Sequence, residues 1–292
     1  MSSLKEEELI NILPKNGPTV EEVKKYLEKY TKDFIVIKMG GSVLSNKDLF
    51  NNLIQDIVVL KKLGLSIFLI HGGGSKISKK LDHLNIKSNF INGLRVTDDK
   101  IIDIVEDVLV QFNKEIVDAL NNQYCGAKEI TSKKDNIIIV KPEDDTLGFV
   151  GKPIKINTNT LTEIIKDNKV PVIASLGLDE NDQAFNINAD SVAGVIAKEL
   201  KARRLLILSD VEGVLNKDKK LIPEINSDQA KKMIIDGAIS GGMIPKIDNC
   251  LDVAKNGVKA VCIIDGRKNH SVLFELLSDK GSGTLIREWK IY

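Results

Sequence analysis

A lysine and two glycines follow an apolar run near the start of the chain. The run Phe34–Ile37 is large, apolar and mostly β-branched, which predicts a buried strand that ends at Lys38. Because glycine has no Cβ, the backbone N–H groups of Gly40 and Gly41 can approach an anion closely, and Lys38 adds a positive charge. The chemistry open to this stretch is phosphate binding. Taken alone, however, it is more simply an ordinary tight turn beside a solvated lysine.

The order of apolar strand and glycine-containing turn recurs at two later places. Ser66–Ile70 leads into His71-Gly-Gly-Gly74, and Leu205–Leu208 leads into Ser209-Asp-Val-Glu-Gly213. Because the carboxyl ends of parallel strands meet at one edge of a sheet, these turns predict an anion site at that edge. A dinucleotide loop is excluded, since Ile77 stands where Gly-x-Gly-x-x-Gly requires glycine. A P-loop is excluded as well, since glycine-lysine-serine/threonine occurs nowhere.

Polar side chains also stand beside two predicted helices. Arg95 lies within Asn92–Thr97, directly before a long helix, where an arginine could hold a carboxylate through two parallel hydrogen bonds. Taken alone, Arg95 is more simply a surface arginine. Asn186, Asn188 and Asp190 precede the next predicted helix. Helix capping by Asn188 or Asp190 explains one of these three polar residues but not all of them.

Apolar periodicity predicts the elements that must position these motifs. Helices are expected after Asn46, Asp98 and Asp190, where apolar residues recur at helical intervals. Ser240–Lys246 is expected to open another helix, because Pro245 is tolerated only in a first turn. The other predicted segments are the helices Thr160–Asp167 and His270–Leu277 and the strands Ile137–Val140, Gly148–Gly151, Val170–Ala174 and Val258–Ile264.

Residues 1–33 precede the first predicted strand and form a separate extension. Thr19 and Glu22 have the spacing of a helix capping box. The helix that follows is amphipathic and lies outside the main fold, so it packs either on its own subunit or on another one, and both alternatives stay open. Its apolar stripe consists of Val20, Val23, Leu27 and Tyr30.

The composition excludes several classes of function. The net charge is +1, from 42 basic and 41 acidic residues, so no overall field favours nucleic acid or an anionic membrane. The apolar runs are too short to span a bilayer, and the N-terminus lacks the features of a signal peptide. Three separated cysteines and three scattered histidines predict reduced thiols in a cytoplasmic protein and no structural metal site.

Taken together, the motifs resemble those of the amino acid kinase family, and closely those of members that phosphorylate N-acetyl-L-glutamate. The resemblance covers nearly the whole chain, from residue 34 to residue 286. It implies a three-layer α/β/α sandwich with a largely parallel central sheet, an N-lobe (34–175) for the amino-acid substrate and the phosphoryl site, and a C-lobe (176–292) for ATP. It rests on Lys38-x-Gly-Gly41, His71-Gly-Gly-Gly74, Asn92-Gly-Leu-Arg-Val-Thr97, Asn186-x-Asn-x-Asp190, Ser209-Asp-Val-Glu-Gly213 and Gly241-Gly-Met-Ile-Pro-Lys246.

The reaction that this resemblance implies is phosphoryl transfer from ATP to the side-chain carboxylate of N-acetyl-L-glutamate, with Mg²⁺ bridging the nucleotide phosphates. The carboxylate is already ionised at neutral pH, so the protein must supply alignment and charge neutralisation rather than a general base. By the same resemblance, Lys38 and Lys246 flank the transferred group and Asp190 holds both lysines. The N–H groups of Gly41 and Gly74 hold the oxygens of that group.

Further binding residues follow from the same resemblance. One departure from the family is Ser42-Val-Leu44, where many members have asparagine or histidine followed by alanine and methionine, and it puts the local packing in doubt. Arg95 is expected to take the α-carboxylate of the substrate. The implied substrate residues are Gly73, Gly74, Arg95 and Asn186, and the implied nucleotide residues are Gly40, Ser209, Asp210, Gly213, Met243 and Lys246.

The N-terminal helix extends the resemblance to a regulated group within the family. The resemblance to members with such an extension implies a hexamer, built as a trimer of dimers, that arginine inhibits. The implied effector residues are Tyr26, Lys217, Glu275 and Gly283, the last of them in the tail Gly281–Ile286. Whether a nitrogen-signalling regulator docks on the chain is left open.

Two other functions remain in competition. The first is a kinase for N-acetyl-aminoadipate, which is one carbon longer, although Arg95-Val-Thr97 matches the glutamate form better. The second is a non-catalytic arginine sensor of the same fold. Such a sensor would not need Lys38, Asp190 and Lys246, so their presence argues against it.

Overall fold

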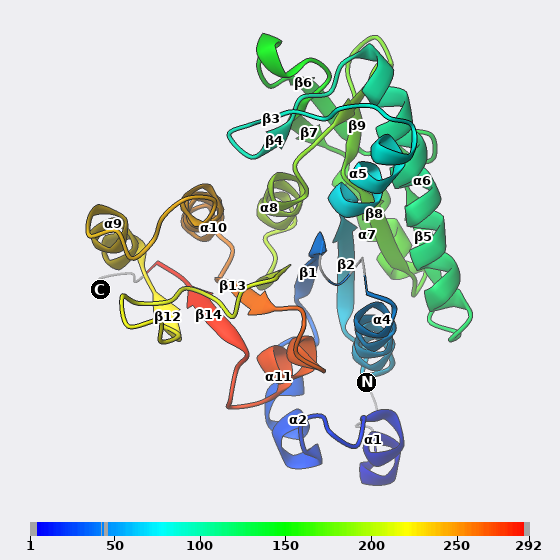
Figure 1. Ribbon diagram of the computed structural model, residues 1–292. Coiled ribbons are helices and arrows are strands. Elements are labelled where there is room, and N and C mark those ends of the chain that lie inside the picture. The colour runs from blue at the N-terminus through cyan, green and yellow to red at the C-terminus, as the bar shows by residue number, and fades with distance from the viewer. Residues whose placement is uncertain (1–4, 42, 44–45, 289–292) are drawn as a thin grey trace.

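The computed structural model describes residues 5–41, 43 and 46–288 of the chain. Its centre is an eight-stranded sheet in which only the pairing of the third strand with the second is antiparallel (Figure 1). In spatial order the strands are β12 (Glu224–Ile225), β14 (Gly283–Ile286), β13 (Ala260–Asp265), β11 (Arg204–Ser209), β1 (Phe34–Met39), β2 (Ser66–His71), β8 (Val170–Ala174) and β5 (Ala127–Ile130).

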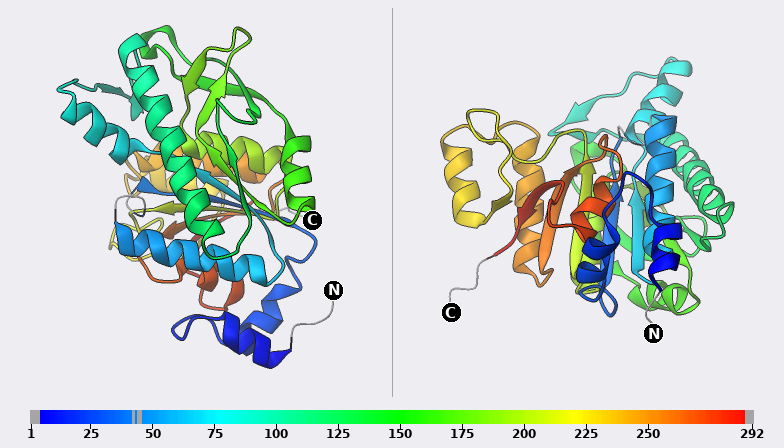
Figure 2. Two further views of the ribbon diagram at one scale, coloured as in Figure 1. Left: turned by 90° about the vertical axis from the view of Figure 1, so that its right-hand side faces the viewer. Right: turned by 90° about the horizontal axis from the view of Figure 1, so that it is seen from below.

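Helices cover both faces of this sheet, which confirms the predicted three-layer α/β/α sandwich (Figures 1 and 2). One face carries α7 (Thr158–Lys166), α8 (Ala189–Glu199), α9 (Ser227–Ile235) and α10 (Met243–Lys255). The other carries α2 (Val20–Leu27), α4 (Lys47–Lys62), α6 (Asp99–Asn121) and α11 (Ser271–Leu277).

Alternation along the strands divides the interior into two cores. Val36 of β1 and Phe68 of β2 belong to the core under α8, whereas Ile35 and Ile37 belong to the core under α4. Successive side chains of a strand point to opposite faces. Because both faces are covered, the central strands are apolar throughout rather than alternating, which is why short apolar runs were enough to predict them.

The predicted helix starts coincide with side-chain caps. Asn46 accepts hydrogen bonds from two backbone N–H groups at the start of α4, and Asp98 does the same at the start of α6. Of the two candidates before α8, Asn188 is the cap, with its Oδ1 accepting from the N–H of Asp190 at 2.8 Å. The Asp190 side chain is therefore available for another role.

A smaller sheet lies at one end of the molecule (Figure 1). The predicted strand at 148–151 is wrong: a 3-10 turn (Asp145–Leu147) precedes Gly148, whose φ is +66°, and the strand begins only at Gly151. Most of the elements that periodicity missed have only two to four residues. The smaller sheet consists of β10 (Ala184–Asn186), β9 (Leu176–Leu178), β6 (Ile138–Pro142) and β7 (Gly151–Ile156), and the hairpin β3 (Phe90–Ile91) and β4 (Leu94–Arg95) lies next to α5 (Gly74–His83).

The N-terminal extension packs on its own chain. Both hydrogen bonds of the predicted capping box are present between Thr19 and Glu22. Val23 and Tyr30 are buried in the core under α4, and α2 lies beside α11 (Figure 2). The Tyr30 hydroxyl accepts a hydrogen bond of 3.3 Å from Nε of Arg204 at the start of β11. Of the two alternatives for the apolar stripe, the structure supports burial within the subunit.

Two expectations from composition can be compared with the structure. Cys125, Cys250 and Cys262 are all buried and unpaired, as predicted. Within the described ranges, no helix combines the length and the apolar character needed to cross a membrane.

Candidate active site

The glycine turns that follow β1 and β2 meet at one edge of the sheet. Lys38 is paired in register with Ile70, and Met39 with His71, so the two strands end side by side. A cavity of about 270 Å³ opens there. Its lining includes Lys38, Gly41, Gly74, Arg95, Asn186 and Asp190, which the sequence placed in the substrate and phosphoryl sites.

Asp190 lies between two lysines. Lys38 Nζ is 2.8 Å from Oδ1 of Asp190, and Lys246 Nζ is 2.6 Å from Oδ2. The three side chains are only 12–18% exposed. Burial opposes ionisation of Asp190 and is the largest single effect, but the two ammonium groups together outweigh it and lower its pKa to about 2. The carboxylate is therefore ionised at neutral pH and holds both cations at one point.

The elements behind Asp190 explain its position. It lies in the first turn of α8, and its backbone carbonyl accepts a hydrogen bond of 3.1 Å from Nδ2 of Asn249 on α10. A Cβ at Gly194 would lie 2.9 Å from Cγ2 of Val253, so α8 and α10 approach each other where glycine leaves room. That approach brings Lys246, in the first turn of α10, to the carboxylate.

The first two turns contain glycines of two kinds: some are close to neighbouring atoms, and others face open space. A Cβ at Gly41 or at Gly74 would meet nothing within 4 Å, so both positions face open space at the cavity. A Cβ at Gly40 would lie 2.3 Å from the carbonyl oxygen of Leu208, and one at Gly73 would lie 2.6 Å from Cδ2 of Leu109. Gly40 and Gly73 are thus required by close packing, whereas Gly41 and Gly74 leave the backbone accessible to a ligand.

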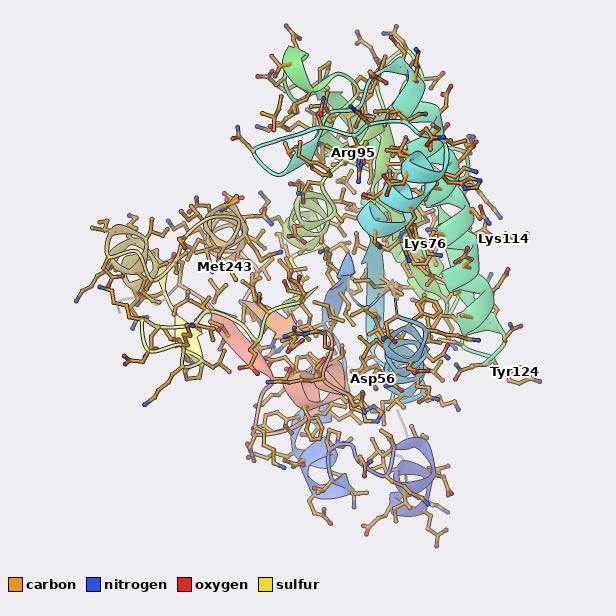
Figure 3. The ribbon with its side chains drawn as sticks, viewed as in Figure 1. Asp56, Lys76, Arg95, Lys114, Tyr124 and Met243 are labelled. Atoms are coloured by element: carbon orange, nitrogen blue, oxygen red, sulfur yellow. The ribbon has the colours of Figure 1, made fainter. Side chains whose placement is uncertain are left out.

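Arg95 lies between the β3–β4 hairpin and α5 (Figure 3). Its guanidinium donates to Ser88 Oγ, to Ser78 Oγ at 2.8 Å and to the carbonyl oxygen of Gly74 at 3.1 Å, and it stacks 4.6 Å from the centre of the Phe90 ring. Burial lowers the pKa of Arg95 below its usual value. A guanidinium has five N–H donors, so two remain for a ligand beyond these three.

A second, larger cavity adjoins the first. Its volume is about 1110 Å³, and Gly241, Gly242 and Lys246 at the start of α10 contribute to its lining. Asp190 lines both cavities, whereas Lys38 lines only the smaller and Lys246 only the larger. The paired lysines therefore mark the boundary at which the two cavities meet.

The other predicted nucleotide residues lie outside the lining of both cavities. Ser209 and Asp210 are at the end of β11, where the Ser209 Cα would lie 3.4 Å from a Cβ placed on Gly40. Gly213 has φ +140°, and a Cβ there would lie 2.6 Å from Oγ1 of Thr284, so glycine is needed for packing. Met243, at the first position of α10, packs against the core under α8 (Figure 3).

The four implied effector residues fall into two groups. The hydroxyl of Tyr26 donates to Asp279 just beyond α11, and Glu275 on α11 accepts a 2.9 Å hydrogen bond from the N–H of Ser282. Gly283 begins β14, directly after this segment. Lys217 instead lines a separate hollow of about 380 Å³ beside α9.

Two buried pairs were missed by sequence reasoning. His270 Nδ1 lies 2.7 Å from Oδ1 of Asp56, which links the start of α11 to α4. His71 Nε2 lies 3.0 Å from Nδ2 of Asn113, beneath the second glycine turn. The available signal was the polar Asn113 among the apolar residues of a long amphipathic helix.

Of the residues noted as a departure from the family, Ser42 and Leu44 lie outside the described residues, and Val43 is buried.

The donor set can be tested for a fit to Mg²⁺. Both oxygens of Asp190 are engaged by lysines, and the described residues contain no cluster of three histidine, cysteine, aspartate or glutamate side chains suited to a metal. Mg²⁺ commonly keeps several waters and binds through substrate phosphates. The residues present therefore fit an ion carried mainly by the nucleotide and water.

The sequence is similar over nearly its full length to proteins of assigned activity. The sequence model of the amino acid kinase family matches residues 33–265 of the chain. The chain is 71% identical over 288 residues to acetylglutamate kinase of Pelagibacter ubique (strain HTCC1062), covering 99% of this chain and 100% of that protein. It is 45% identical over 264 residues to acetylglutamate kinase of Campylobacter fetus subsp. fetus (strain 82-40), covering 90% of this chain and 94% of that one.

Solved structures share the same architecture. N-acetylglutamate synthase from Neisseria gonorrhoeae, complexed with coenzyme A and N-acetyl-glutamate, matches with a TM-score of 0.85 at 22% identity, covering 93% of this chain and 63% of that one. Carbamate kinase from Giardia lamblia bound to AMP-PNP matches with a TM-score of 0.65 at 17% identity, covering 88% and 99%. At these identities the likeness establishes the fold.

Proposed function

The chain belongs to the amino acid kinase family, and on that premise we propose that it transfers the γ-phosphoryl group of ATP to the side-chain carboxylate of N-acetyl-L-glutamate. The observation that carries the proposal is the shared carboxylate of Asp190, which holds Lys38 and Lys246 at the boundary between the two cavities. The smaller cavity is the proposed acceptor site, and the larger one is the proposed site of the nucleotide phosphates.

The proposed reaction needs no proton transfer. A carboxylate oxygen of the acceptor forms a bond to the γ-phosphorus, and the bond from that phosphorus to the bridging oxygen of ADP breaks, so the products are an acyl phosphate and ADP. Lys38 on the acceptor side and Lys246 on the nucleotide side neutralise charge on the transferred group and help to align it. Asp190 keeps the ammonium groups in place. When bound, Mg²⁺ supplies further neutralisation of the β- and γ-phosphates.

The acceptor is held by two features of the smaller cavity. Arg95 keeps one N–H on Nε and one on Nη1, and either can donate a hydrogen bond to a carboxylate, while stacking on Phe90 fixes the plane of the guanidinium. Asn186 donates through Nδ2 to Oγ1 of Thr97 at 3.3 Å, which leaves its amide oxygen for the acetylated amino group. Open backbone at Gly74 leaves room for the phosphoryl oxygens.

The nucleotide is proposed to extend from Lys246 across α10 toward α9. Gly241 and Gly242 precede the first turn of α10 and line the larger cavity, so the positive end of the helix dipole faces the proposed phosphate site. The base would occupy the hollow of about 380 Å³ beside α9, whose lining includes Ile222, Ile225 and Met233. α9 packs against α10, which keeps the hollow close to the phosphate site.

Arginine inhibition and a hexameric assembly are proposed as regulation. The supporting contacts are those of Tyr26 and Lys25 with Asp279, which join α2 to the segment after α11. An effector bound at this junction could favour one arrangement of the extension over another, and an effector acts only through such a difference in affinity. Tyr26, Glu275 and Gly283 are the proposed effector residues at this junction, and Lys217, the fourth proposed effector residue, lies apart from them at the hollow beside α9.

The test is a coupled assay of ADP release with N-acetyl-L-glutamate and with N-acetyl-aminoadipate, each with and without arginine. The expected result is ADP release with N-acetyl-L-glutamate at a much higher kcat/KM, lowered by arginine. A higher kcat/KM with N-acetyl-aminoadipate would show that the longer substrate, rather than N-acetyl-L-glutamate, is the acceptor. Arginine binding by calorimetry without any ADP release would instead indicate a sensor that does not catalyse.

A further inference from the structure

A buried pair of polar side chains, His71 and Asn113, lies beneath the second glycine turn, and the mechanism described above gives neither of them a role. His71 is the last residue of β2, and Asn113 lies on α6; both side chains are fully buried. Nδ2 of Asn113 is 3.0 Å from Nε2 of His71, and Nδ1 of His71 is 3.0 Å from the carbonyl oxygen of Gly72. Burying a polar group costs free energy unless the group is hydrogen-bonded, and these contacts link Asn113 through His71 to the second glycine turn.

The partners of Asn113 determine the tautomer of His71. Nδ2 of Asn113 also lies 2.9 Å from the carbonyl oxygen of Val172, which can only accept, so the amide group that faces it is the NH₂ donor. The same NH₂ faces Nε2 of His71, so Nε2 must accept. In a neutral imidazole the proton is then on Nδ1, which donates to the carbonyl oxygen of Gly72. Burial lowers the pKa of His71 to about 4, which keeps the ring neutral at physiological pH.

This hydrogen bond fixes the orientation of the peptide between Gly72 and Gly73. The carbonyl and N–H of a trans peptide point in opposite directions. With the carbonyl of Gly72 held toward the imidazole, the N–H of Gly73 is directed away from it. Both glycines line the smaller cavity, and among the described residues no group accepts from this N–H. A peptide flanked by two glycines has unusual freedom to rotate, so it needs an external restraint.

We propose that His71 is a positioning residue, whose Nδ1–H holds the Gly72 carbonyl so that the backbone donors of the 72–74 turn face the phosphoryl group during transfer. Asn113 holds the imidazole in the one tautomer that can do this. The inference rests on the proposed function, because the donors matter only if an anion develops in the smaller cavity. His71 itself exchanges no proton with the substrate.

Two substitutions separate positioning from simple filling of the core. In His71→Asn, the side-chain amide nitrogen takes the place of Nδ1 and can still donate to the Gly72 carbonyl. In His71→Gln, the amide reaches the place of Nε2, can satisfy Asn113, and leaves the Gly72 carbonyl without its donor. The expected result is a kcat about 10²-fold lower in His71→Gln, comparable with the loss of one anion-stabilising donor, with little change in KM for ATP. His71→Asn should rescue most of that loss.

Thermal unfolding of both variants supplies the structural control. If His71 only fills space, the two variants should lose stability and activity in parallel, and kcat should not distinguish them. Equal kcat in the two variants would therefore overturn the inference. Wild-type protein that releases no ADP with N-acetyl-L-glutamate would overturn the proposed function, and this inference with it.

A measurement on the unsubstituted protein applies even if the variants do not fold. The chain contains three histidines, so selective ¹⁵N-histidine labelling gives a simple NMR spectrum. The expected signal from a fully buried ring shows a protonated Nδ1 and an unprotonated Nε2, unchanged from pH 5.5 to pH 8. The signals of His83 and His270 are identified by their loss in His83→Gln and His270→Gln. A remaining signal, that of His71, with its proton on Nε2, or one that titrates in this range, would overturn the inference.

Discussion

The ammonium group of Lys38 on β1 lies 2.8 Å from a carboxylate oxygen of Asp190 on α8, although 151 residues separate them in the chain. The other oxygen of the same carboxylate is 2.6 Å from Lys246 Nζ. Two cations held this close repel each other, and the shared anion offsets the repulsion. Because both oxygens of Asp190 contact lysines, we propose that Asp190 positions them rather than accepting a proton.

Replacing either lysine by alanine should lower kcat much more than it affects folding. In the proposed mechanism each ammonium acts mainly on charge in the transition state, and one such contact is typically worth ~10²–10³ in rate. Steady-state kinetics with saturating ATP and N-acetyl-L-glutamate would measure the loss for Lys38→Ala and Lys246→Ala. The matched control is Lys198→Ala, which removes a lysine paired with Asp252 at 2.6 Å outside the cavities. Near-normal turnover in either active-site variant would refute the assignment.

Asp190 should contribute to stability in a pH-dependent way. Its pKa is lowered from 3.8 to about 2 in the folded protein, so its contribution is present above about pH 4 and is lost as the pH falls through 2. The difference in unfolding free energy between wild type and Asp190→Asn should therefore shrink by on the order of 2 kcal/mol between pH 5 and pH 2. Urea titrations across this range would test it, and a difference independent of pH would contradict it.

Arg95→Lys should raise KM for the acetylated amino acid while leaving KM for ATP nearly unchanged. Lysine keeps the charge but loses the planar fork that hydrogen-bonds Ser78 and Gly74 and stacks on Phe90. Initial rates with each substrate varied in turn would measure both constants. Arg203→Lys, at a salt bridge with Asp33 outside the cavities, is the matched control. An equal rise in both KM values would place Arg95 in another role.

Deleting residues 1–30 should destabilise the protein and, if the proposed assembly is correct, convert hexamers into dimers. The deletion removes Val23 and Tyr30 from the core under α4, so the melting temperature should fall. Sensitivity to arginine should weaken, because the contact of Tyr26 with Asp279 is lost, whereas turnover by the folded fraction should persist. Light scattering, thermal unfolding and initial rates with and without arginine would test these expectations together.

Tyr26→Phe is the milder control for that deletion. It removes the hydroxyl that donates to Asp279 but leaves the helix and its buried residues in place. It should weaken inhibition by arginine without changing stability as much as the deletion does. A truncated protein that stays hexameric and fully sensitive to arginine would restrict the extension to packing on its own subunit.

The sequence alone predicted the features that depend on a few neighbouring residues. Apolar runs predicted the central strands because both faces of the sheet are covered, and Asn46 and Asp98 predicted helix starts because a cap bonds N–H groups only two or three residues away. Short strands such as β12 were missed, because two residues carry no periodic signal. The resemblance to a family, rather than spacing, predicted that Lys38, Asp190 and Lys246 belong to one site.

Only the tertiary structure decided which distant side chains meet. His270 and Asp56 are 214 positions apart, and His71 and Asn113 are 42 apart, so no local pattern joins either pair. The sequence likewise did not determine that Val23 and Tyr30 are buried on their own chain. An amphipathic stripe indicates that an apolar face must be covered, but it does not indicate which surface covers it. The physical reason is common to all three: local sequence sets backbone preference, whereas partners are selected by how whole helices and strands pack.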